Sequence, residues 1–146
     1  MAIATRAFWK DSDFGDNFQY NLAGTPCHNI VETHALCRYG HSVQEHFPDD
    51  ADLVAFNAES YVGIAILNPA NKFLGYISVI NTEPMEQELE LQVFILEIFA
   101  ARAGAEIERM QTEKALIASN KKIQQQAQRE QLLNQIANQI RTSLDL

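Results

Sequence analysis

Several features that define whole classes of protein are absent, or nearly absent, from this 146-residue chain. It has two cysteines, Cys27 and Cys37, and they are not spaced as a CxxC pair. A disulfide framework and a structural zinc site are therefore both disfavoured. No stretch approaches the roughly 18 consecutive apolar residues that a membrane span needs, and the first residues lack the basic and then apolar pattern of a signal peptide. We therefore expect a cytoplasmic protein without a membrane partner.

Positive charge and phosphate-binding motifs are also scarce. The chain has eleven Lys and Arg residues and 19 Asp and Glu residues, which gives a formal net charge of −8. Because an acidic surface repels a phosphate backbone, nucleic-acid partners are disfavoured. The chain contains neither GxxxxGK nor GxGxxG, and no kinase or cyclase signature. We expect a protein that is not an enzyme, with no catalytic residues, no metal and no cofactor, although a small ligand of unknown identity is compatible with this composition.

Aromatic residues stop early, since the last one is Phe99. The last glycine is Gly104, and from about Glu86 onward the pattern predicts one long helix. A segment without aromatic residues buries its apolar surface by helix pairing more readily than in a globular core. We therefore predict a globular domain over residues 1–104 and a helical coiled-coil linker toward a following domain over residues 105–146.

Beyond residue 104, apolar residues recur at a spacing close to that of a two-stranded coiled coil. A lone helix of this composition would be marginal in water, so it requires a partner. We expect a parallel homodimer formed through the C-terminal helix. The predicted dimer seam consists of Ile107, Met110, Ile117 and Ile123.

Turn and cap signals divide the first part of the chain into short elements. Thr25 followed by Pro26 is typical of a helix start, here a helix to about Thr33. The pair Asp49 and Asp50 can cap a second short helix over 51–56. The clearest strands are SYVGIAIL and KFLGYISVI, joined by an Asn-Pro-Ala-Asn loop that suits a β-hairpin. The predicted strands cover 4–9, 17–22, 36–39, 60–67 and 72–80, with a helical turn over 42–47. This order predicts an α+β fold with an antiparallel sheet flanked by short helices.

Five segments carry a resemblance to a known family. They are AFW at 7–9, YNLAGTPC at 20–27, FPDD at 47–50, AESYVG at 58–63 and LGYISV at 74–79. In order and spacing they resemble a GAF domain of the bacterial multidomain sensor proteins, the sensor histidine kinase type included. The resemblance implies a GAF or PAS-like antiparallel sheet. It also implies a sensory module that receives a signal and relays it, through a dimeric C-terminal helix, to a downstream signalling domain such as a histidine kinase.

The sequence departs from this family pattern in two places. Such domains usually begin with a helix and a strand that precede the segment at 7–9, and the strand is normally central in the sheet. The resemblance therefore implies an N-terminally truncated domain, a missing element supplied by another chain, or a sheet that forms differently. In addition, His28 stands where the subgroup often has Glu, so a role for that acid cannot be transferred.

The resemblance also predicts a ligand pocket between the sheet and the short helices. Two other functions are compatible with the same residues. The first is a structural dimerisation module without a ligand. The second is a redox sensor based on Cys27, because a helix N-terminus can lower the pKa of a thiol. The predicted pocket residues are Cys27, Val31, Cys37, Tyr39, Phe47, Leu53 and Tyr61.

Three groups of polar residues admit more specific interpretations. Cys27 followed by His28 resembles the pair that attaches a bilin in photosensory GAF domains, but its position after Gly-Thr-Pro fits a helix start better. The other two groups could hold a metal ion, although scattered surface positions and helix capping explain them more simply. They consist of His34, Cys37, His41 and His46, and of Asp49, Asp50 and Asp52.

Overall fold

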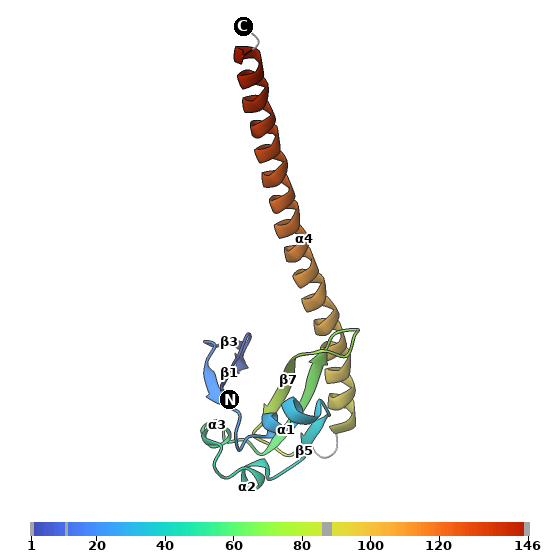
Figure 1. Ribbon diagram of the computed structural model, residues 1–146. Helices are drawn as coiled ribbons and strands as arrows, with labels where there is room; N and C mark the ends of the chain where they lie inside the picture. The colour runs from blue at the N-terminus through green and yellow to red at the C-terminus, as the bar shows by residue number, and fades with distance from the viewer. Residues whose placement is uncertain (1, 11, 86–88, 145–146) are drawn as a thin grey trace. The chain divides into compact units, whose positions relative to one another are not determined.

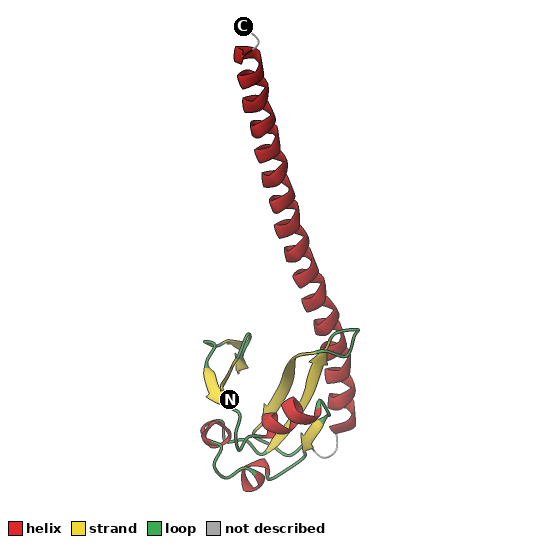
Figure 2. Cartoon of the chain, in the orientation of Figure 1, coloured by secondary structure: helices red, strands yellow, loops and turns green. Residues whose placement is uncertain are grey.

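The computed structural model describes residues 2–10, 12–85 and 89–144, and the chain divides into two units, Met1–Ala105 and Glu106–Leu146. The division lies one residue after the boundary expected at 104. The chain is a mixed α and β protein with small antiparallel sheets and a long C-terminal helix (Figures 1 and 2). Among the described residues, no helix is both long enough and apolar enough to cross a membrane.

A β-hairpin is the main part of the larger sheet. Strands β6 (Ser60–Leu67) and β7 (Phe73–Asn81) pair antiparallel, and β5 (Cys37–Tyr39) pairs with the other edge of β6. In the connecting loop the Asn68 side chain accepts hydrogen bonds from the backbone N–H groups of residues 70 and 72. The predicted hairpin is confirmed, with the second strand displaced by one residue.

The N-terminal strands form two further sheets of their own. Strand β1 (Ala2–Ala4) pairs with β4 (Gln19–Asn21), and β2 (Trp9–Lys10) pairs with β3 (Asp13–Phe14). The sequence predicted one strand over 4–9 in a single sheet, and this prediction is wrong.

Side-chain hydrogen bonds join the backbone pairing after β1, where the Thr5 N–H still donates to the Phe18 carbonyl at 2.9 Å. The Phe18 N–H donates to Thr5 Oγ1 at 2.9 Å, and Asn17 Nδ2 donates to the Arg6 carbonyl at 3.2 Å. Because side chains satisfy these backbone groups, the segment between residues 4 and 9 has an alternative to extended pairing. This explains why the predicted strand is interrupted.

Three short helices follow the predicted order. They are α1 (Pro26–Thr33), α2 (Val43–His46) and α3 (Ala51–Ala55). Asp50 caps α3 as predicted, since its carboxylate accepts from the N–H groups of Asp52 and Leu53. Thr25 stands at the N-cap of α1, but its hydroxyl donates to the Leu22 carbonyl at 2.9 Å and does not cap the helix.

The larger sheet has two covered faces because side chains alternate along each strand. Tyr61 and Ala65 belong to a core cluster with Cys27 and Ile30 of α1, while Val62 packs in a second cluster against the C-terminal helix. The two layers of helix on either side of the sheet are visible in Figure 1. Both core clusters therefore lie within the first unit.

Helix α4 (Leu89–Leu144) begins in the first unit and packs on the sheet through Leu96, Ala100 and Gly104. The predicted start at about Glu86 lies outside the described residues. A Cβ atom at Gly104 would overlap the Leu67 carbonyl group at the end of β6. Glycine is therefore required for the helix backbone to approach the strand this closely.

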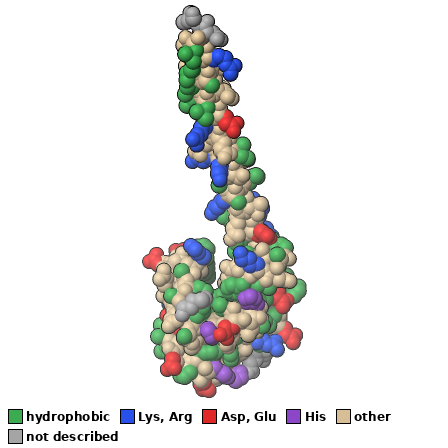
Figure 3. All heavy atoms as spheres, in the orientation of Figure 1, with side chains coloured by type: hydrophobic (Ala, Val, Ile, Leu, Met, Phe, Trp, Pro, Cys, Tyr) green, Lys and Arg blue, Asp and Glu red, His purple; other side chains and the backbone are tan. Residues whose placement is uncertain are grey.

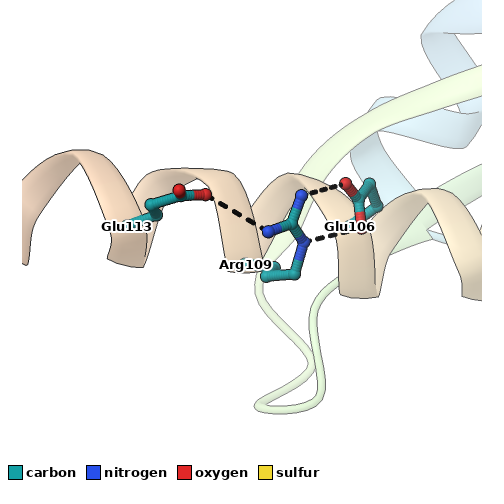
Figure 4. A network of polar contacts seen from close by, with 3 residues as sticks. All are labelled: Glu106, Arg109 and Glu113. Atoms are coloured by element: carbon teal, nitrogen blue, oxygen red, sulfur yellow. Dashed lines mark hydrogen bonds and ion pairs between the residues drawn. The ribbon is translucent and has the colours of Figure 1, made fainter.

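In the second unit, the side chains of α4 are exposed from Arg109 to Leu144. Arg109 binds both carboxylate oxygens of Glu106, and its other terminal nitrogen lies 3.2 Å from Glu113 (Figure 4). These are pairs at helical spacing on a solvent-exposed face, so each adds little to stability. Figure 3 shows hydrophobic side chains on the surface of the helix toward its C-terminal end.

Candidate functional site

The structure brings the predicted pocket residues together in one core cluster of the first unit. Cys27, Cys37, Leu53 and Tyr61 are buried there, and Val31, Tyr39 and Phe47 pack against them. Tyr61 belongs to β6, and the other side chains come from β5 and from the short helices or the residues next to them. The cluster is a packed interior that contains several polar atoms.

Cys27 and Tyr61 form the centre of this polar interior. Cys27 Sγ lies 3.1 Å from Tyr61 Oη, and either atom can donate the hydrogen bond. Tyr61 also interacts with the side chain of Ser78, which the hairpin register places opposite Gly63. An ideal Cβ at Gly63 would lie 2.5 Å from Ile30 Cδ1, so the glycine allows α1 to approach the strand.

Burial keeps the Cys27 thiol and the Tyr61 hydroxyl of this interior protonated. It raises the pKa of Cys27 to about 11, against the smaller opposing effect of the Tyr61 hydrogen bond. The pKa of Tyr61 is raised well above its ordinary value, first by burial and then by the neighbouring Cys27. Both groups are therefore neutral at physiological pH.

A second polar group surrounds Cys37. Burial raises the pKa of Cys37, and hydrogen bonds with the side chains of Tyr39 and Asn29 oppose this shift. The pKa of Tyr39 is raised too, chiefly by burial. This arrangement can hold a neutral polar group or simply satisfy the core, and it does not activate a thiol as a nucleophile.

The histidines of the first candidate metal group occupy separate environments. The His34 ring stacks on Phe73 with centroids 4.9 Å apart, and His46 Nδ1 lies 3.1 Å from the Ser42 carbonyl. Within the described ranges, no three His, Cys, Asp or Glu side chains converge on a point that could hold a metal ion. Asp50 of the acidic group is used as a helix cap.

The residues at the start of β6 also have structural partners. Glu59 Oε1 accepts the Ser42 backbone N–H at 2.9 Å, and the Ser60 hydroxyl donates to the Glu83 carbonyl at 2.6 Å. Of Glu59, Ser60 and Tyr61, only Tyr61 belongs to the core cluster that contains the polar interior. Their partners explain the polar start of a buried strand.

A separate groove of about 450 Å³ lies in the first unit, between the β6–β7 hairpin and α4. None of the seven predicted pocket residues lines it. Its wall is mostly apolar, and Glu97 contributes one carboxylate from α4. The lining residues are Ile64, Ala65, Leu67, Asn68, Pro69, Asn71, Glu97, Ala100, Ala101 and Ala105.

Sequence reasoning missed this groove and one member of the polar interior. Ser78 could have been found by pairing the two hairpin strands, because the residues opposite Tyr61 and Gly63 share their face. The groove had no such signal. It arises because Ala100, Ala101 and Ala105 leave space beside the hairpin loop, and alanine in a helix is ordinarily read as a helix former.

The four predicted seam residues lie on the part of α4 beyond Ala105. Ile107 is half-buried, and Met110, Ile117 and Ile123 are exposed.

Compared with known proteins, the chain matches no family model and no curated protein. Membership of the GAF family therefore stays a prediction from the sequence.

Proposed function

We propose that this protein is a sensory module of the GAF type, which binds a small ligand beside α4 and relays the event through a dimer of that helix. The relay would act on a downstream signalling domain such as a histidine kinase. The observation that carries the proposal is the position of the groove. Four of its lining residues, Glu97, Ala100, Ala101 and Ala105, belong to α4 itself. A ligand in the groove therefore contacts the helix that continues into the second unit.

The groove also indicates the chemistry of the ligand. Its wall is largely aliphatic, so an apolar group gains by leaving water there. Glu97 is the acidic residue of the lining and its side chain is exposed. A small compound with an apolar body and a cationic group matches these features. Such a ligand shifts the helix only if it binds the two states of the dimer with different affinities.

The dimer partner is a second copy of the chain, joined along α4. Met110 and Ile117 are seven residues apart, and continuing their spacing leads to Lys121, Gln124 and Gln128. Leu116 and Ile123 are also seven apart, and after polar positions their spacing of three and four reaches a continuous apolar series from Leu133 to Leu144. We therefore assign the seam, here called the Leu116 seam, to Leu116, Ile123, Leu133, Ala137, Ile140 and Leu144.

Ile123 is the one member of the earlier predicted seam that shares this spacing. The large side chains of the Leu116 seam are all exposed in the single chain, so an apolar stripe is free to pair. Polar residues at Ser119, Gln126 and Glu130 interrupt the stripe. These interruptions weaken the pair, and a dimer that is not too tight suits a relay between two states.

The redox alternative has less support than ligand binding. It requires a thiolate at Cys27, whereas burial raises the pKa of that thiol to about 11. The ligand-free dimerisation module is favoured by one observation, namely that the predicted pocket residues form a packed cluster. The experiment below separates it from the sensor.

Cross-linking along the seam tests the proposal. In an Ile123→Cys variant, the rate of disulfide formation between copies reports the pairing of α4, because Cys27 and Cys37 are buried. The rate is measured with and without a panel of small aliphatic amines. We expect a subset of compounds to change the rate, and we expect a second substitution, Ala101→Leu, to abolish the change by filling the groove.

Ala118→Leu is the matched control, since it adds the same side chain to an exposed position of the same helix. It should leave the response intact. A response that survives Ala101→Leu contradicts the groove as the ligand site. Rates that are fast but insensitive to every compound would support the ligand-free dimerisation module.

A further inference from the structure

One of the residues that interrupt the Leu116 seam is charged, and a residue of opposite charge directly precedes it. Glu130 continues the spacing of Leu116 and Ile123 by one further heptad, and Arg129 is the residue before it. Both side chains are exposed in the single chain. In a heptad written abcdefg, with core positions a and d, Glu130 is at a and Arg129 is at the flanking position g. An acid therefore lies on the seam with a base at its border.

The same arrangement occurs near the start of the second unit with the signs reversed. Counting back one heptad from Leu116 leads to Arg109 at a core position, and Glu108 directly precedes it. Arg109 binds Glu106 and Glu113 of its own helix through three N–H groups (Figure 4), and a guanidinium group has further N–H groups to donate. Two charged core positions, three heptads apart, are thus each preceded by the opposite charge.

This charge pattern is complementary to itself when two copies of the helix lie parallel and in register. Each core side chain of a parallel coiled coil inserts into a hole between residues of the facing helix, and the residue at g before the facing core position forms one wall of that hole. Glu130 of one copy therefore meets Arg129 of the partner subunit. In the same way Arg109 meets the partner's Glu108. By symmetry each contact occurs twice in the pair of helices.

Other alignments of the same helix lose this complementarity. With a shift of one heptad, Glu130 of one copy meets Lys122 of the partner subunit, but the reciprocal contact is with Ile136. Arg109 of each copy then faces an alanine in place of a glutamate. In an antiparallel pair the g positions of the two copies flank each other, so Glu130 and Arg129 of different copies are not brought together. The charges therefore favour an identical helix, aligned residue by residue.

Charged groups on the same helix do not compete for Glu130 and Arg129. Helical side chains contact those three and four residues away, and none of these positions is charged. Within residues 89–144, neither Glu130 nor Arg129 forms an ion pair. The six neighbouring positions hold Gln125, Gln126, Ala127, Leu132, Leu133 and Asn134.

We propose that Glu130 of each copy binds Arg129 of the partner subunit, and that this contact selects a second, parallel and in-register copy of α4 as the partner. Arg109 and the partner's Glu108 form the second pair of contacts. The inference rests on the homodimer of the proposed function and adds what selects its partner and its alignment. Apolar residues of the seam supply most of the affinity, while the charges supply selectivity. A misaligned helix is rejected because a charge would then face an apolar residue.

Charge reversal in the cross-linking protein, which carries Ile123→Cys, tests the proposal. One chain also carries Glu130→Arg and the other carries Arg129→Glu. Each variant alone places like charges across the seam, whereas a mixed pair restores both contacts. The two chains are mixed in equal amounts in a glutathione buffer, which lets the disulfides exchange, and mass spectrometry measures the mixed and unmixed covalent dimers. We expect an exchange constant at least about tenfold above the random value in favour of the mixed dimer.

Opposite net charges attract even without specific contacts, so the control mixture carries the same charge differences away from the seam. Gln128 and Gln135 are exposed and occupy the outer position f. One control chain has both residues replaced by Arg and the other has both replaced by Glu, each together with Ile123→Cys. We expect this mixture to give mixed and unmixed dimers in the random ratio. A single chain with both Arg129→Glu and Glu130→Arg should cross-link as fast as the parent, since the exchanged charges still meet.

Three results would overturn the proposal while the homodimer remains. They are equal enrichment of the mixed dimer in the control mixture, random mixing of the seam variants, and slow cross-linking of the chain with exchanged charges. Failure of the Ile123→Cys protein to cross-link at all would be a different outcome. It would remove the homodimer of the proposed function and the charge pairing with it.

Discussion

At the scale of the single residue, Gly104 has less room for a side chain than the other glycines for which the contacts of an added Cβ are known. A Cβ atom there would overlap the Leu67 carbonyl, and backbone cannot give way as a flexible side chain can. We expect Gly104→Ala to lower the free energy of unfolding by about 1–3 kcal/mol, in spite of the better helix propensity of alanine. Urea unfolding of the wild type and the variant measures the difference.

Gly75→Ala is the matched control for this substitution. It makes the same chemical change on β7, where an added Cβ would meet no atom within 4 Å. We expect it to change stability by less than about 0.5 kcal/mol. If both variants lowered the free energy of unfolding equally, the contact between α4 and the end of β6 would not be the reason that position 104 requires glycine.

At the scale of the element, α4 offers two stripes that make opposite predictions. We expect Leu116→Asp with Ile123→Asp to dissociate the dimer, because two charges would then enter the Leu116 seam. Met110→Asp with Ile117→Asp adds the same charges to the other stripe and should leave the dimer intact. Sedimentation equilibrium at several concentrations distinguishes dimer from monomer. The opposite pattern would return the seam to Met110 and Ile117.

The elements also show where sequence reasoning succeeds. The start of helix α1 was predicted correctly because Thr25 and Pro26 mark it locally, and its end at Thr33 agrees with the predicted end near that residue. Strand β6 was predicted equally well, since a β-rich run is bounded by turn residues on both sides. The pair Asp49 and Asp50 was predicted to cap α3 from its position alone, and the structure assigns the cap to Asp50, which accepts two backbone hydrogen bonds.

The failures concern information that is not local. The prediction of one sheet was wrong because pairing depends on residues far apart in the chain, such as Thr5 with Asn17 and Phe18. The predicted pocket residues do meet, since apolar periodicity marks a core. The same periodicity cannot tell a filled core from a cavity, and the groove depends on how closely α4 packs beside the hairpin loop.

At the scale of the whole molecule, the buried Cys27 thiol and Tyr76 hydroxyl make the free energy of unfolding depend on pH in the alkaline range. Burial raises the pKa of Cys27 from 9.0 to about 11 and that of Tyr76 from 10.0 to about 12. The native state then holds protons that the unfolded state releases above pH 9. Their contribution is fully present below pH 9 and is lost as pH rises through the raised values. For Cys27 the loss amounts to about 3 kcal/mol, at roughly 1.4 kcal/mol for each pH unit.

Urea unfolding between pH 8 and about 11 measures this loss. We expect Cys27→Ala to flatten the part of the curve that begins near pH 9, the ordinary pKa of the thiol. Tyr76→Phe should flatten the part that begins near pH 10. A free energy of unfolding that is constant across this range would show that these groups titrate normally in the folded protein.

The early end of the aromatic residues has an optical consequence. Every tyrosine and the single tryptophan precede Phe99, so near-ultraviolet absorbance and intrinsic fluorescence originate only in the first unit. Trp9 lies with its ring edge-on to Phe14, 4.9 Å between centroids, and its emission reports on the β2–β3 hairpin. Far-ultraviolet circular dichroism is instead dominated by the 56 residues of α4. Because α4 begins in the first unit, the circular dichroism signal follows the helix as a whole, whereas the aromatic signals follow the first unit alone, and neither requires a label.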